Sequence, residues 1–160
     1  MRNHEFFAVR LEEEVAAFLR VLRAVPSDHL DYRPHERSTS AGDLAWQIAS
    51  EMANLIDLLE TGVADYRPAP RPDNSEEMAR TFEKAAERAA NLARAIDVDR
   101  WKGPGKFLFQ GHLSWEASVA EIAWGFLFDL VHHRGQLSVY LRPMGAKVPR
   151  IYGPSGDEPD

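Results

Sequence analysis

The chain has 160 residues, of which 44% are hydrophobic and 28% charged, and its formal net charge is −6. This length and composition are typical of one globular domain, so residues 1–160 are predicted to form a single domain. The absence of cysteine excludes disulfides, thiolate metal ligands and a cysteine nucleophile, so any bound metal would need nitrogen and oxygen ligands. The negative charge gives no general reason to expect nucleic acid as a partner.

The sequence also lacks the pattern of a membrane protein. No apolar run approaches the roughly 20 residues that a membrane-spanning helix needs. The first residues, MRNHEFFAVRLEEEV, carry acidic side chains where a secretory signal needs an apolar run. We therefore expect no membrane partner and a cytoplasmic location.

The first predicted helix covers about residues 4–24. Its apolar side chains recur at helical spacing, and Pro26 ends the pattern. His4, at the start of this helix, is expected at the surface. The apolar stripe consists of Phe7, Leu11, Val15, Phe18, Leu22 and Val25.

The second predicted helix covers about residues 41–60 and is capped by Ser40. Gln47 and Glu51 lie one turn apart and adjoin its buried side, so polar groups intrude on a core face here. A hydrogen-bonded boundary position is the simpler interpretation of Gln47, and Glu51 fits an inward or a solvated position equally well. The buried side consists of Leu44, Ile48, Leu55, Leu58 and Leu59.

The next connection, residues 61–74, contains three prolines and is predicted to cross the molecule in an extended form. Asn74, with Glu77 three residues on, is an N-cap for an alanine-rich third helix over about residues 75–96. Residues 97–117 are predicted to be irregular, with at most a short strand pair at residues 106–109.

The fourth predicted helix begins after Ser118, which forms a capping box with Glu121, and it ends near Pro143. Asp129 and His133 lie one turn apart, on or beside its apolar stripe. A carboxylate and an imidazole on an apolar face are costly unless they are paired, hydrogen-bonded or bound to metal. They are therefore predicted to form the floor of a polar site. The apolar stripe consists of Ile122, Phe126, Leu130, Leu137 and Leu141.

Four amphipathic helices with little strand signal predict an all-α fold, a four-helix bundle with long crossover connections. Connections of this length allow parallel as well as antiparallel neighbours, so a simple up-down-up-down order is not required. The last residues, 153–160, are rich in proline, glycine and acids, and we expect them to be a mobile tail.

Two stretches resemble the DinB family of damage-inducible, YfiT-like metalloenzymes. They are HHRGQLSVYLR at residues 132–142, followed by a tail with Val148-Pro149 and Tyr152-Gly153, and LAWQIASE at residues 44–51. The resemblance covers most of the chain. It implies a four-helix bundle with crossover connections, a homodimer and a role in stress response.

The resemblance also implies a divalent-metal site of three histidines. One histidine comes from the second helix, and two come from the fourth helix, the later one immediately before Arg-Gly-Gln. His133 matches that later position, whereas Asp129 and Gln47 stand where the family has the other two histidines. Arg134 and Gln136 would support the site or contact a neighbouring chain, and His132 points about 100° away from His133 on an ideal helix.

Three hypotheses follow. In the first, Asp129, His133, Gln47 and Glu51 hold zinc, nickel or manganese, and the protein is a metal-dependent hydrolase or thiol transferase acting on a small molecule. In the second, the same side chains form a metal-free hydrogen-bonded network in an inactive small-molecule binding or stress-response protein. In the third, the chain is a purely structural dimer module.

Overall fold

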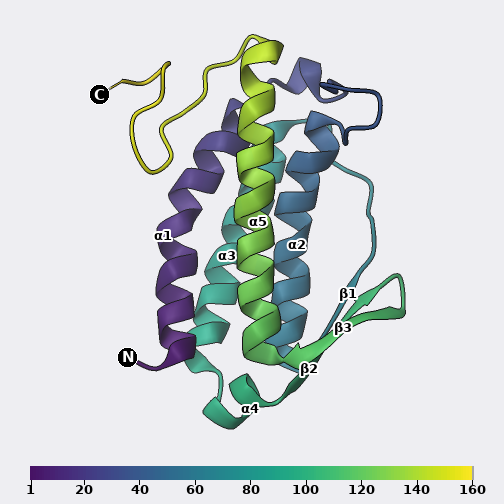
Figure 1. Ribbon diagram of the computed structural model, residues 1–160, viewed down its shortest axis with the longest axis vertical. Helices are drawn as coiled ribbons and strands as arrows, with labels where there is room; N and C mark the ends of the chain where they lie inside the picture. The colour runs from purple at the N-terminus through teal and green to yellow at the C-terminus, as the bar shows by residue number, and fades with distance from the viewer. Residues whose placement is uncertain (160) are drawn as a thin grey trace.

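The computed structural model describes residues 1–159 as a mostly helical fold with a small sheet (Figure 1). Five α-helices, three strands and two short 3₁₀ helices follow one another along this part of the chain. They are α1 (Asn3–Ala24), η1 (Ser27–His29), α2 (Ala41–Thr61), β1 (Val63–Tyr66), α3 (Ser75–Ala95), α4 (Val98–Lys102), β2 (Pro104–Phe109), β3 (His112–Ser118), α5 (Val119–Leu141) and η2 (Arg142–Met144).

Four long helices lie side by side. Helices α1 and α5 run in one direction and α2 and α3 in the other (Figure 1). Helix α3 packs against α1 and α2, and α5 packs against the same two helices. Residues 67–74 return along the outside of α2, where Trp46 Nε1 donates to the carbonyl of Ala69 at 3.0 Å. This return makes α2 and α3 parallel neighbours, an arrangement that the long connections allowed.

The sheet corrects the all-α prediction. Strand β2 pairs with β1 in parallel and with β3 antiparallel, in the order β1-β2-β3. Only the region of β2 had been expected to form strand, as a short pair at residues 106–109. The pairing of β1 with β2 could not be predicted from local pattern, because β1 has four residues and pairs with residues more than forty positions later, Val63 with Lys106. Strand β3 carries an irregularity opposite Phe107 and Leu108, which breaks its alternation.

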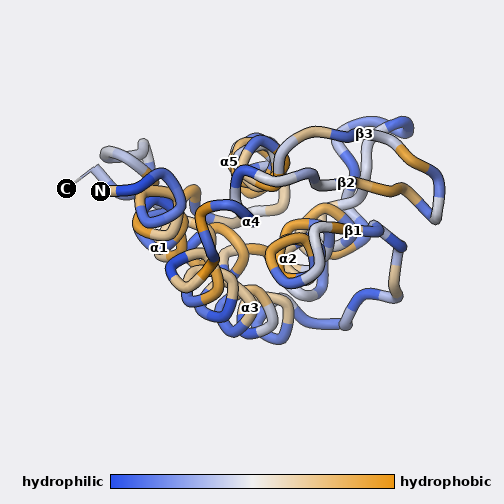
Figure 2. The backbone as a smooth tube through the Cα atoms, turned by 90° about the horizontal axis from the view of Figure 1, so that it is seen from below, coloured by the Kyte–Doolittle hydropathy of each residue, from blue (hydrophilic) through white to orange (hydrophobic). Residues whose placement is uncertain are grey.

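The core lies between the four long helices. Figure 2 shows that the positions of hydrophobic residues on these helices face one another. Every residue of the predicted stripe on α5 is buried, as is every residue of the predicted stripe on α2. The predicted caps are also confirmed: Ser40 accepts from Asp43 N, Asn74 from Glu77 N, and Ser118 from Glu121 N. The helices therefore form where periodicity and capping agree.

The prediction that His4 lies at the surface is wrong, because the residue is buried. Its Nδ1 lies 2.9 Å from the carbonyl oxygen of Ala93 on α3, and its ring lies 6.3 Å from that of Trp101 on α4. Helix α4 lies in the connection that had been predicted to be irregular. It places Trp101 against the start of α1, which removes His4 from water.

The C-terminal segment contacts the end of α5. The Asp157 carboxylate accepts hydrogen bonds from Val148 N at 2.9 Å and Arg142 Nε at 3.0 Å. Mobility of residues 153–159 remains a prediction, and residue 160, which the same prediction includes, lies outside the described residues. Within the described residues, no helix is long and apolar enough to cross a membrane.

Candidate functional site

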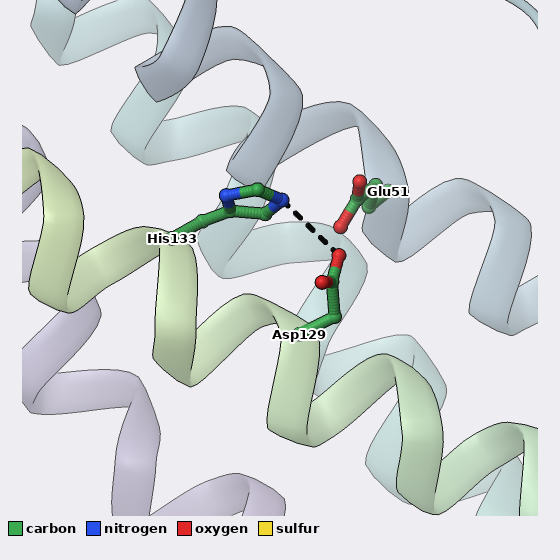
Figure 3. A group of neighbouring side chains, drawn as sticks. All are labelled: Glu51, Asp129 and His133. Atoms are coloured by element: carbon green, nitrogen blue, oxygen red, sulfur yellow. Dashed lines mark ion pairs between the residues drawn. The ribbon is translucent and has the colours of Figure 1, made fainter.

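Three side chains that could bind a cation meet between α2 and α5 (Figure 3). Glu51 comes from α2, and Asp129 and His133 come from successive turns of α5. Because α2 and α5 pack against each other, an i, i+4 pair on α5 faces the third group directly. One ligand atom from each side chain lies within 4.8 Å of the other two.

Gln47 connects this cluster. Its Nε2 lies 2.9 Å from Glu51 Oε1 and 2.8 Å from His133 Nε2. An amide nitrogen donates to both atoms when the imidazole is neutral with its proton on Nδ1. In that state His133 Nδ1 faces Gln136 Oε1 at 3.3 Å, so Gln136 lies where it would orient the ring.

Asp129 and His133 face each other in direct contact on successive turns of α5. Asp129 Oδ2 lies 3.2 Å from His133 Nε2, the same nitrogen that faces the Gln47 amide. In the neutral imidazole, this contact sets a carboxylate lone pair against a nitrogen lone pair. It becomes favourable when a proton or a metal ion lies between the two acceptors.

Glu51 is the most buried member of the cluster, with 5% of its surface exposed. Burial raises the pKa of its carboxyl to about 7, and the negative charge of Asp129 adds to the rise while the Gln47 hydrogen bond opposes it. Its Oε2 is buried and has no hydrogen-bond partner among the described residues. Such an orphaned oxygen carries a free-energy cost that a proton or a cation would remove.

The residues present fit a divalent metal ion. Glu51 offers an unpartnered oxygen, Asp129 a carboxylate with half its side chain exposed, and His133 a ring nitrogen. Two carboxylates and one imidazole form a donor set suited to zinc and to harder ions such as manganese. Gln47 would have to turn its amide oxygen inward to join them, since its nitrogen faces His133.

A cavity of about 320 Å³ adjoins the cluster, between α5, α2 and the sheet. Glu51 and Asp129 form part of its wall, and the rest is mainly apolar. The residues that line it are Glu51, Tyr66, Phe107, Trp115, Ile122, Gly125, Phe126 and Asp129. The cluster is therefore accessible to a small molecule.

Arg134, predicted to support the site or contact a neighbouring chain, lies away from the cluster, and His132 lies at the surface as predicted. The Arg134 guanidinium is buried against α1, where it pairs with Glu14 and donates to the hydroxyl of Tyr152. His132 is exposed and makes no contact with Glu51 or Asp129 in the cluster, as its position on the helix indicated.

The sequence reasoning missed the cavity walls contributed by the sheet, which are Tyr66, Phe107 and Trp115. The place of Tyr66 depends on the pairing of β1 with a strand more than forty residues later, whereas Phe107 and Trp115 face each other in the β2–β3 hairpin, whose turn contains Gly111. Gly125 did offer one signal, a glycine inside an apolar helical stretch, where a missing side chain often permits a close contact. A Cβ atom at Gly125 would lie 2.6 Å from Cζ3 of Trp115.

Comparison with known proteins gives a family and a fold. The model of the DinB family matches residues 1–160. A DinB-like protein of Bacillus cereus is 19% identical with a TM-score of 0.72, over 91% of this chain and 95% of its own. One of Bacillus subtilis is 16% identical with a TM-score of 0.69, over 91% of this chain and 96% of its own. No curated protein matches the sequence.

Proposed function

The chain belongs to the DinB family, and from this premise we propose that it is a metal-dependent enzyme acting on a small molecule, with Glu51, Asp129 and His133 as metal ligands. One observation carries the proposal. Three potential ligands from two helices converge within 4.8 Å, and one of them is a buried carboxylate oxygen without a partner. Gln47 fills the family's third histidine position as a neutral neighbour or weak ligand.

A divalent ion bound there would supply a Lewis acid and would lower the pKa of a bound water, which suits hydrolysis or group transfer. The chain's own residues have separate tasks. Gln136 would hold the His133 ring through Nδ1, so that Nε2 faces the cluster. Glu51 and Asp129 would place negative charge at the end of the cavity, and the apolar walls would exclude water from a bound molecule.

The test is metal analysis of protein purified without a nickel column. We expect a stoichiometric ion, and stabilisation when zinc, nickel or manganese is added to metal-free protein. His133→Ala should remove both effects, whereas His132→Ala, a matched change at the exposed neighbour on the same helix, should keep them. Wild-type protein that retains no ion and gains no stability from any of the three metals would contradict the proposal.

A second candidate function is a metal-free pocket, and the contacts of Gln47 favour it. The Gln47 amide nitrogen donates to Glu51 and to an unprotonated His133 Nε2, and this hydrogen-bonded network needs no ion. The protein would then bind a small molecule without turning it over. In that case His133→Ala should lower stability and leave metal content unchanged at zero.

We also propose that the protein forms a homodimer through an exposed side of α5. Phe128 and Val139 are 67% and 73% exposed and lie eleven residues apart, which places them on one face of the helix. Phe6 of α1 is also exposed, and its ring packs on Trp124, next to Phe128. An apolar surface of this kind is typical of an interface between subunits.

A further inference from the structure

The cavity beside the cluster has an apolar end and a polar end, both set by α5. Ile122, Gly125 and Phe126 line it one to two turns before Asp129. Because residues three and four apart share a helix face, the lining changes from apolar to acidic along one line. A molecule in the cavity would therefore lie along α5, with its reactive group toward Asp129 and Glu51.

Aromatic side chains form the walls of the apolar end. Phe107 of β2 packs edge-on against Phe126, with ring centroids 5.4 Å apart, and pairs across the sheet with Trp115 of β3. The Trp115 ring lies against Gly125, where the absence of a Cβ leaves room for it. These faces suit a flat ring between them, since aromatic pairs prefer edge-on and offset arrangements.

The charge of the residues that line the cavity disfavours anionic ligands. Its titratable groups are Glu51, Asp129 and Tyr66, and none of the described lining residues is lysine or arginine. Two carboxylates would cancel the charge of a divalent ion, and without an ion the lining offers acidic groups and no cationic side chain. In both states a buried anion would find no compensating positive side chain.

The volume limits the size of the ligand. About 320 Å³ is at the small end of the roughly 300–1,000 Å³ found for ligand pockets. We propose that this cavity binds an uncharged molecule with a single aromatic ring and rejects anions of the same shape. The inference rests on the proposed function in taking the cavity as the place where the substrate meets the cluster.

The test uses two probes of equal shape and different charge, methyl phenyl sulfone and benzenesulfonate. Ligand-observed NMR titrations would be run on the full chain as purified and after chelation of metal, with the metal content of each sample measured. We expect the neutral sulfone to bind in the millimolar range and the sulfonate to bind at least roughly tenfold more weakly in both samples.

Three variants locate the binding. Gly125→Ala places a Cβ against the Trp115 ring and should weaken sulfone binding by roughly tenfold or more, without touching the three ligands. Gly135→Ala is the matched control, since a Cβ there meets nothing within 4 Å, and its affinity should equal that of wild type. Trp115→Ala removes a wall without a clash and should also weaken binding, which keeps the test valid if Gly125→Ala fails to fold.

The outcomes separate this inference from the proposed function. Sulfone binding that depends on Gly125 or Trp115, in a protein without metal, supports the inference and contradicts the metal site. A stoichiometric ion without sulfone binding supports the metal site and overturns the inference. Equal affinity for sulfone and sulfonate, or sulfone affinity unchanged in both cavity variants, also overturns it.

Discussion

Glu51 carries a carboxyl group that α2 turns into the interior, with 5% of the residue exposed. Burial raises its pKa from 4.5 to about 7, and the neighbouring charge of Asp129 adds to the rise. At neutral pH this side chain is therefore divided between its protonated and ionised forms. A metal ion would favour the ionised form, and a metal-free network the protonated one.

This pKa predicts how the stability of the metal-free protein depends on pH. Because the folded state keeps the Glu51 proton to a higher pH than the unfolded chain, its contribution is present below pH 4.5 and is lost as pH rises to about 7. A shift of this size corresponds to about 3 kcal/mol. Urea unfolding between pH 4.5 and 8 should show this decline in wild-type protein.

Glu51→Gln should remove the decline of unfolding free energy between pH 4.5 and 8, because it replaces the titrating carboxyl by an amide of the same shape. Asp57→Asn, at an exposed position of the same helix, should retain the decline. In metal-saturated protein the stabilisation by the ion should instead grow with pH, because the ligands must lose their protons to bind it. If the decline in stability persists in Glu51→Gln, another titrating group causes it.

Gln47 supports a second prediction at this scale. Its Nε2 lies 2.8 Å from His133 Nε2, so an imidazole at residue 47 would point toward the same cluster. Gln47→His should raise zinc affinity by roughly tenfold or more, because imidazole is a far better ligand for this ion than an amide. Competition with a chelator measures the change, and an affinity equal to wild type would show that residue 47 does not face the ion.

At the scale of elements, Arg134 joins α5 to α1 and to the C-terminal segment. Its side chain is 2% exposed. The guanidinium pairs with Glu14, donates to the hydroxyl of Tyr152 and lies 4.7 Å from the centre of the Phe18 ring. Tyr152 also donates to Glu14 at 2.9 Å. The contacts of Arg134 thus hold helices together on the side of α5 that faces away from the cluster.

Replacing Arg134 removes the buried cation that faces the Glu14 carboxylate, and leaves that carboxylate with the Tyr152 hydroxyl at 2.9 Å and Arg10 at 3.8 Å. Arg134→Leu should therefore cost about 3–5 kcal/mol of unfolding free energy, while Glu14→Leu with Arg134→Met should recover most of the loss. Arg88→Leu removes an exposed ion pair with Glu60 and should cost about 1 kcal/mol or less. Urea unfolding measures all three, and a small loss in Arg134→Leu would show that Arg10, Tyr152 or water compensates the Glu14 charge.

The sequence predicts those elements whose formation depends on neighbouring residues. Helix periodicity and caps depend on residues within two turns, and they predicted α1, α2, α3 and α5 nearly to their ends. The pairing of Asp129 with His133 followed from i, i+4 spacing. The pairing of β1 with β2 and the burial of Glu14 opposite Arg134 depend on residues forty to more than a hundred positions apart, which no local pattern encodes.

At the scale of the molecule, the connections determine how the helices meet. The return of residues 67–74 makes α2 and α3 parallel, and the segment from α4 to β3 brings α5 against α2. The cavity arises because that same segment places β2 and β3 beside α5 (Figure 2). A site with ligands on two helices and walls on the sheet thus depends on the whole topology.

The proposed dimer is testable at this scale as well. Light scattering at micromolar concentration should give twice the mass of the chain. Phe128→Glu should give the mass of one chain, because it puts a charge into the apolar face of α5. Lys84→Glu, at an exposed position of α3, should leave the dimer intact. A wild-type monomer would contradict the proposal.

The most direct test of the metal site is an anomalous difference map from crystals of wild-type protein grown with zinc. We expect a peak bonded to His133 Nε2 at about 2.0–2.1 Å, with Asp129 and Glu51 oxygens as further ligands. A map without a peak at this position, in crystals where Gln47 still bridges His133 and Glu51, would contradict it.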